Sequence, residues 1–131
     1  MTAQTRFVVA GTKSSPAIDF DPETGLLCIR GESYPEHCAR FYEPMFAWLR
    51  HYLAGSGSAP VELEMEIIYF NSSSSKTFMD LFDLLDTAAA RGRRVAVRWR
   101  YHAENETAFE CGEEFREDVA HVRFLLERIE A

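Results

Sequence analysis

The strand–helix–strand pattern between residues 61 and 101 constrains the fold more than any other part of the chain. In Val61–Phe70, apolar side chains alternate with three glutamates, as expected of a β-strand that buries one face. A serine-rich break, Asn71–Ser75, leads into Lys76–Ala90, where apolar residues recur at helical spacing. Alternation returns over Val95–Tyr101, which predicts another strand. The unit is long enough for a parallel crossover, so we expect helices packed against a sheet.

Burial can be predicted from the same pattern. Tyr69 and Trp99 lie on the apolar faces of the two strands, and we expect both to be at least partly buried. The break at Asn71–Ser75 is entirely polar and is expected on the surface.

A β-hairpin and a helix are expected before this unit. Ala17–Phe20 and Leu26–Arg30 alternate on either side of the strong turn formers in Asp21–Gly25. Ser33, with Glu36 three residues later, has the spacing of a capping box. Apolar positions then recur at helical spacing from Tyr34 to Tyr52, across Pro44, and the glycine- and serine-rich segment Gly55–Pro60 is expected to end this helix and form a loop.

The end of the chain predicts a final helix. It holds Phe109, Gly112, Phe115 and Val119, and the spacing of Val122, Leu126 and Ile129 permits it to continue. The expected element order is therefore ββαβαβα, an α/β sandwich with a mixed sheet and helices packed on it.

Composition excludes several classes of protein. A chain of 131 residues with 47% apolar residues is expected to form one domain, 1–131. Its net charge of −7 argues against nucleic acid, and the short basic cluster at Arg91–Arg94 is expected to decorate a turn. The sequence shows no membrane-spanning window or signal pattern, and its three cysteines are widely spaced, so we expect a cytoplasmic protein with reduced thiols. No ligand cluster predicts a metal, and no cofactor is expected.

The serine run is the best candidate for a functional site. Ser72, Ser73, Ser74 and Ser75 lie between a strand end and a helix start, where free N–H groups and the helix dipole favour a negative charge. A phosphoryl group on one of them would bring a charge of about −2, and Lys76 could offer it a cation. The simpler interpretation is that Ser74 or Ser75 only caps the helix while the others form a solvated turn.

Two other functions remain open at this point. A small serine hydrolase would need a histidine and a carboxylate beside the 72–75 serine run. A small-molecule or nucleotide sensor would need a sizeable pocket.

Several segments, which together span almost the whole chain, resemble those of one known family. Gly31–Glu36 (GESYPE) and Tyr69–Lys76 (YFNSSSSK) are specific, and Thr12–Ile18, Trp99–Tyr101 and Gly112–Phe115 support them in the same order. Together they resemble the SiaC family of bacterial regulatory phosphoproteins. That resemblance implies a STAS-like fold and a partner-switching module that is not an enzyme.

The resemblance also implies partners and site residues. A Ser/Thr protein kinase would phosphorylate the hydroxyl after the Asn of the YFN motif, and a PP2C-type phosphatase would remove the group. The acceptor is commonly Thr in the family and is Ser72 here, with Asn71, Ser73, Ser74, Ser75 and Lys76 around it. The unphosphorylated form would bind and activate a diguanylate cyclase, raising cyclic di-GMP and favouring biofilm formation. We expect Glu32, Ser33, Tyr34 and Pro35 to contribute to partner docking, with Ser33 alternatively serving only as a cap.

Overall fold

The computed structural model describes residues 4–55 and 59–130, so the expected loop at Gly55–Pro60 lies partly outside the described residues. Within the described part of the chain the elements are β1 (Phe7–Val9), β2 (Ala17–Phe20), β3 (Leu26–Ser33), α1 (Cys38–Ala54), β4 (Val61–Phe70), α2 (Ser72–Ala90), β5 (Val95–His102), α3 (Glu106–Asp118) and β6 (Arg123–Ile129). Of the described helices, none is both long and apolar enough to cross a membrane.

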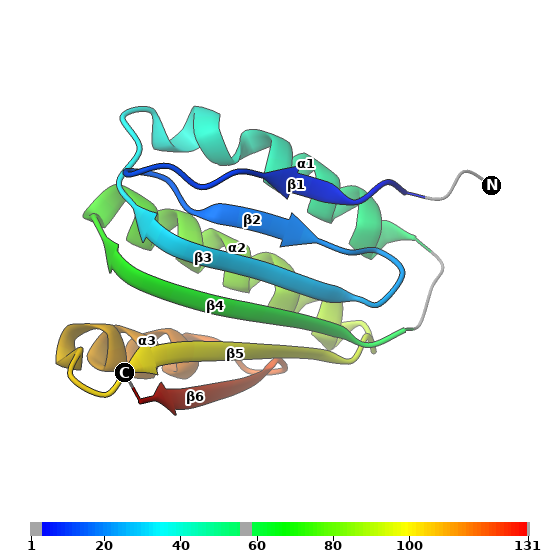
Figure 1. Cartoon of the computed structure of the whole chain (residues 1–131). Helices are drawn as coiled ribbons and strands as arrows, with labels where there is room; N and C mark the ends of the chain where they lie inside the picture. Colours follow the sequence, from blue (N-terminus) through cyan, green and yellow to red (C-terminus); the bar gives the residue numbers. More distant parts are fainter. Residues whose placement is uncertain (1–3, 56–58, 131) are drawn as a thin grey trace.

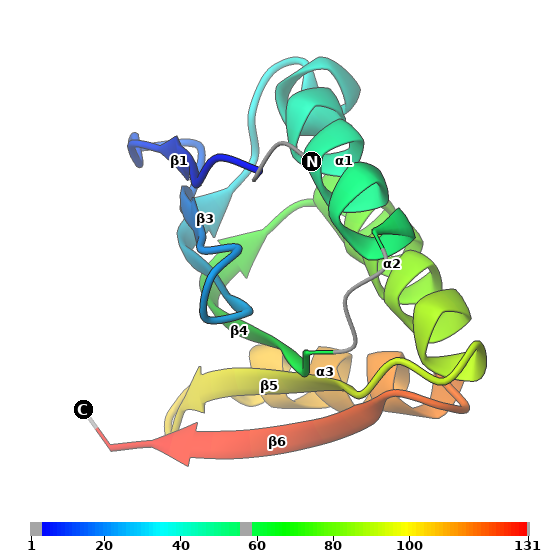
Figure 2. The ribbon, with the colours of Figure 1, turned by 90° about the vertical axis from the view of Figure 1, so that its right-hand side faces the viewer.

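All six strands form one mixed sheet in the order β1-β2-β3-β4-β5-β6. The first three are antiparallel neighbours, whereas β3, β4, β5 and β6 are parallel and are joined in turn by α1, α2 and α3. Crossovers of one hand put their helices on the same face whenever each new strand is added on the same side. Figures 1 and 2 show this arrangement: the three helices cover one face of the curved sheet, and no described helix covers the other.

The core between the sheet and the helices is rich in aromatic rings. Trp99 of β5 is 1% exposed, which confirms its expected burial. Its ring contacts phenylalanines of α2 and α3 and of the end of β4, with centroids 5.3–6.5 Å apart: Phe70, Phe78, Phe82 and Phe115. Gly112 of α3 makes this contact possible, because a Cβ at this position would lie 2.5 Å from Cδ1 of Trp99.

The opposite face of the sheet carries a network of ion pairs instead of helices. Glu62, Glu64 and Glu66 of β4 alternate with the buried residues of that strand, as expected, and lie beside Arg98 and Arg100 of β5. Arg100 Nη1 donates to Glu64 Oε1 at 2.9 Å, and Arg98 Nη1 lies 3.4 Å from Glu62 Oε2. Each of these three glutamates is therefore paired with at least one of the two arginines.

The hairpin, the long strand and the α/β class with a mixed sheet are confirmed, and the structure adds one strand at each end of the expected order. The addition at the C-terminus changes the expected end of the last helix. That helix ends at Asp118, and Arg123–Ile129 pairs with β5 as β6. Phe124 then packs against Phe82, with ring centroids 5.2 Å apart, so a strand buries this segment better than a continued helix.

The start of the first helix also differs from the expectation. Ser33 is the last residue of β3, and α1 begins only at Cys38, after His37, whose side chain makes no capping hydrogen bond. The predicted capping box at Ser33 and Glu36 is therefore wrong. The physical reason is that the Ser33 hydroxyl is buried in the core, where it shares hydrogen bonds with the hydroxyls of Tyr42 and Ser74.

A bulge near the end of β4 reverses the expected orientation of Tyr69. Gly31 of β3 is opposite Ile67, but the next residue of β3, Glu32, is opposite Tyr69, so Ile68 is an extra residue in β4. One extra residue shifts the alternation of side chains to the other face. Tyr69 is consequently 53% exposed, contrary to the expectation of burial, whereas Phe70 turns toward the core.

Candidate functional site

The structure brings the two most specific sequence stretches together at one edge of the sheet. Glu32 and Ser33 at the end of β3 are opposite Tyr69 and Phe70 at the end of β4, and Asn71 N–H donates to the Ser33 carbonyl at 3.1 Å. Parallel strands end at the same edge, which is where open α/β sheets usually carry their sites. This edge is the candidate functional site.

The loop before β2 belongs to the same site. Tyr34 N–H donates to the carbonyl of Ser14 at 2.7 Å, and the Thr12 hydroxyl accepts from the backbone N–H of Ser15 at 3.0 Å. Gly31 has a φ of +128°, a backbone conformation that residues other than glycine rarely adopt. A Cβ added at this position would lie 3.4 Å from Cα of Pro16. The loop is thereby held against the end of β3.

Helix α2 begins at Ser72, four residues earlier than expected. Asn71 is its N-cap, and its side-chain oxygen accepts from the backbone N–H of Ser74 at 2.9 Å. The expectation that Ser74 or Ser75 caps the helix is therefore wrong, because the preceding asparagine already fills that role. Ser72 occupies the first helical position and is exposed.

Ser74 departs from the expectation that Asn71–Ser75 lies on the surface. Ser72 and Ser73 are exposed, Asn71 and Ser75 are half-buried, and Ser74 is fully buried. A helix turns by 100° per residue, so the third residue of α2 points toward the sheet when the first two point to solvent.

The buried Ser74 hydroxyl connects three elements. It donates to the Ser33 carbonyl at 2.8 Å and shares a hydrogen bond of 2.7 Å with the Ser33 hydroxyl, which in turn shares one of 2.6 Å with the Tyr42 hydroxyl of α1. All three side chains are fully buried. Burial raises the pKa of Tyr42 above its ordinary value, although the Ser33 hydrogen bond acts in the opposite direction. This hydroxyl chain ties the first turn of α2 to β3 and α1.

The bulge places exposed apolar surface beside this turn, which sequence reasoning missed. Ile68 is 52% exposed, and the Tyr69 ring packs edge-on against Tyr34 with centroids 5.7 Å apart. Asn105 fixes the bulge by donating from Nδ2 to the Ile68 carbonyl at 2.9 Å. The available signal was the apolar Ile68, which interrupts the alternation with glutamates.

The surroundings of the serines bear on the hydrolase alternative. The partners of the Ser74 hydroxyl are the Ser33 hydroxyl and carbonyl and, at 3.7 Å, the Cys38 thiol, so this serine has no adjacent general base. Over residues 4–55 and 59–130, no group of three or more His, Cys, Asp or Glu side chains is placed to hold a metal ion.

Comparison with known proteins decides the family. A family model described as SiaC family regulatory phosphoprotein matches residues 9–129. The chain belongs to the SiaC family. It is 43% identical over 112 residues to an uncharacterized protein of Pseudomonas aeruginosa, a match that covers 86% of this chain and 88% of the relative.

Two solved structures that contain SiaC from Pseudomonas aeruginosa superpose closely on this SiaC family member. One, of SiaC, has a TM-score of 0.88 at 37% identity and covers 95% of this chain and 99% of that chain. The other is the diguanylate cyclase SiaD in complex with its activator SiaC, with a TM-score of 0.88 at 39% identity, covering 94% and 99%. The expected family, the expected fold class and the expected regulatory role are confirmed.

Proposed function

We propose that this chain is a phosphorylation-switched activator of a diguanylate cyclase, with Ser72 as the phosphoacceptor. The observation that carries the proposal is the exposed Ser72 hydroxyl at the first position of α2, on the edge where the GESYPE and YFNSSSSK stretches meet. The solved complex of SiaD with its activator SiaC supports the choice of a diguanylate cyclase as partner.

The burial of the serines supports Ser72 over most of its neighbours. A kinase must place the acceptor hydroxyl in its own active site, and the fully buried Ser74 cannot enter one while the protein is folded. Ser75 is half-buried, which leaves Ser72 and Ser73 as the accessible hydroxyls of the run. Ser72 follows the capping Asn71 directly, as the acceptor does in the family motif.

The first turn of α2 can accommodate a phosphoryl group without unfolding. The first backbone N–H groups of a helix lack intrahelical acceptors, and the helix dipole adds roughly +0.5 charge at this end. Lys76, one turn later and exposed, supplies a further positive charge. The phosphorylated protein is therefore expected to keep its fold.

A partner that covers this edge would respond strongly to the phosphoryl group. Burying an added dianion without a matching cation costs several kcal/mol, and each loss of about 1.4 kcal/mol weakens binding roughly tenfold. Phosphorylation at Ser72 would then release the cyclase while leaving the regulator intact. A Ser/Thr kinase and a PP2C-type phosphatase are the proposed enzymes of this cycle, and the cytoplasm, where GTP is available to the cyclase, is the proposed location.

Docking is proposed for the surface next to the switch. Glu32, Tyr34 and Pro35 stay in the proposal because they are not fully buried, and Tyr69 joins them through its contact with Tyr34. Ser33 acts indirectly, because its side chain is fully buried and can only hold the end of β3 against α2.

Phosphosite mapping of the protein from its native cells, combined with a cyclase assay, tests the proposal. We expect phosphate on Ser72, and we expect unphosphorylated protein to raise cyclic di-GMP synthesis by SiaD of Pseudomonas aeruginosa. Ser72→Asp should activate at least tenfold less effectively, whereas Ser72→Ala should activate normally and resist phosphorylation.

Ser73→Ala is the matched control, because Ser73 is also exposed and lies one residue away. It should still be phosphorylated and switched. Phosphate on Ser73 alone, or a Ser72→Asp variant that activates as well as the wild type, contradicts the assignment.

A further inference from the structure

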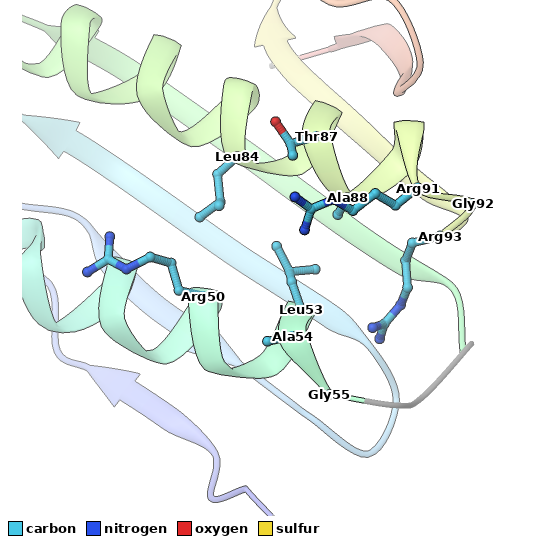
Figure 3. A pocket seen from close by; sticks show the side chains of 10 residues that line it. All are labelled: Arg50, Leu53, Ala54, Gly55, Leu84, Thr87, Ala88, Arg91, Gly92 and Arg93. Carbon is cyan, nitrogen blue, oxygen red and sulfur yellow. The ribbon is translucent and has the colours of Figure 1, made fainter.

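A groove at the other end of α2 is unrelated to the proposed switch. It has a volume of about 470 Å³ and lies between the C-terminal ends of α1 and α2, as Figure 3 shows. This volume is within the range of sites for small organic ligands. Its described lining residues are Arg50, Leu53, Ala54, Gly55, Leu84, Thr87, Ala88, Arg91, Gly92 and Arg93.

Two arginines give this groove a positive charge. In Figure 3 the Arg91 side chain runs back across Ala88 between the two helices, and Arg93 approaches from the start of the following segment. Arg91 forms no ion pair with any described residue. Arg50, at the far end, is instead paired with Glu43 at 3.2 Å.

The charges sum to a positive site on an acidic protein. Two helix C-termini meet here and contribute about −0.5 charge each, against two full positive charges on Arg91 and Arg93. None of the ten described lining residues is acidic, whereas the whole chain carries a net charge of −7. An anion is therefore attracted to this groove in preference to most of the surface.

The remaining walls suit a flat or apolar group. Leu53, Leu84 and Ala88 form the apolar part of the lining. The Arg93 guanidinium lies over the Tyr52 ring at 5.2 Å, and its Nε donates to the Ala59 carbonyl at 3.0 Å, so its plane is held in place. A guanidinium fixed in this way offers a stacking surface to a planar ring.

We propose that this groove binds a nucleotide, with its phosphate groups on Arg91 and its base against Arg93 and the apolar wall. Planar guanidinium groups bind phosphate through paired hydrogen bonds, which a lysine cannot reproduce. Ser72 and Arg91 lie at opposite ends of α2, and its 19 residues span about 28 Å. Binding in the groove is therefore independent of the hydroxyl at Ser72 and of the function proposed above.

Isothermal titration calorimetry of the full chain tests this site, with GTP, ATP, cyclic di-GMP and pyrophosphate as the probes. At least one nucleotide should bind with one-to-one stoichiometry, and pyrophosphate, which has no base, should bind more weakly. Arg91→Ala should weaken the nucleotide about tenfold or more, and Arg91→Lys should recover only part of that loss. The three nucleotide arms distinguish a substrate or product of the proposed cyclase from a general adenine nucleotide.

Arg116→Ala is the matched control, because Arg116 is likewise an exposed arginine near the C-terminal end of a helix, and it should leave nucleotide binding unchanged. Ser72→Ala should also leave it unchanged, which separates this site from the switch. Arg91 is exposed, so its variants should keep the wild-type melting temperature. The proposal is overturned if no nucleotide binds saturably at about 1 mM, if Arg91→Ala binds like the wild type, or if pyrophosphate binds as tightly as every nucleotide.

Discussion

Single hydroxyl groups determine how the switch region is built. Four consecutive serines range from exposed to fully buried, because each residue of a helix start is rotated by 100° from the last. Ser72 meets solvent at the first helical position, whereas Ser74 is enclosed between β3 and α1 and has lost all contact with water. The same residue type thus provides a candidate acceptor and a structural contact within three positions.

Ser74→Ala should destabilise the protein by about 1–3 kcal/mol, because it removes one of the hydrogen bonds made by the buried Ser33 carbonyl and one of those made by the buried Ser33 hydroxyl. The free energy of unfolding from urea denaturation measures this change. Ser73→Ala, at an exposed neighbouring position, should change stability by less than about 0.5 kcal/mol. Equal stability of both variants would show that the hydroxyl chain contributes nothing to the fold.

At the scale of elements, the connection between α3 and β6 depends on one carboxylate of α2. Asp86 accepts hydrogen bonds from the backbone N–H groups of Ala120, His121 and Val122, at 3.2, 2.7 and 2.9 Å. These groups follow the end of α3, where the chain turns into the edge strand. Asp86 therefore positions the start of β6 against the helical layer.

The pKa of Asp86 gives this contact a pH dependence. Partial burial alone would raise the pKa, but the three backbone hydrogen bonds and the nearby His121 together lower it below its ordinary value. The pKa of Asp86 is lower in the folded state than in the unfolded state. Its contribution to the free energy of unfolding is therefore complete at pH values above the unfolded-state pKa, and it is lost as the pH falls through the folded-state pKa.

Asp86→Asn should therefore lower stability by about 1–2 kcal/mol at pH 7, where a charged acceptor is exchanged for a neutral one. The difference in stability between this variant and the wild type should shrink as the pH is lowered through the acid range. Thermal unfolding at a series of pH values would measure this change. Asp83→Asn, on an exposed part of the same helix, serves as the control and should show neither effect. A destabilisation by Asp86→Asn that is constant with pH would contradict the assignment.

For the molecule as a whole, the open face of the sheet is stabilised by charge instead of by a further layer of helices. Glu64 is buried to 8% exposure and lies 2.9 Å from Arg100 and 3.5–3.6 Å from Arg30 and Arg98. This half-buried network of ion pairs keeps the uncovered face of the sheet polar, while the face that packs against the helices holds the core. It also follows from topology, since successive crossovers on one side leave the other face uncovered.

Glu64→Gln should destabilise the protein by roughly 1–2 kcal/mol, less than for a fully buried pair because its arginines are partly exposed. Chemical denaturation in urea, which leaves the ionic strength low, measures the loss. Glu62→Gln is the matched control on the same face and strand, where the side chain is 44% exposed, and it should cost less than about 0.5 kcal/mol. Equal losses of unfolding free energy at both positions would show that burial does not set the strength of these ion pairs.

Sequence alone was sufficient for the features that depend on local pattern. The turn formers at Asp21–Gly25 predicted the hairpin, and the alternation in Val61–Phe70 and Val95–Tyr101 predicted the central strands. The spacing of apolar residues and the turn-forming residues are properties of short segments, so they can be recognised without knowledge of the rest of the chain. The serine run was likewise recognisable as a strand-to-helix junction.

Only the tertiary structure decided the features that depend on distant partners. Ser33 has the spacing of a helix cap, yet its hydroxyl is buried because Ser74 and Tyr42 meet it there. Residues 123–129 form a strand because β5 offers a free edge, and Tyr69 faces solvent because the bulge at Ile68 shifts the register against β3. In each case two conformations satisfy the local pattern about equally, and burial against another element, absent from any short window of sequence, selects one of them.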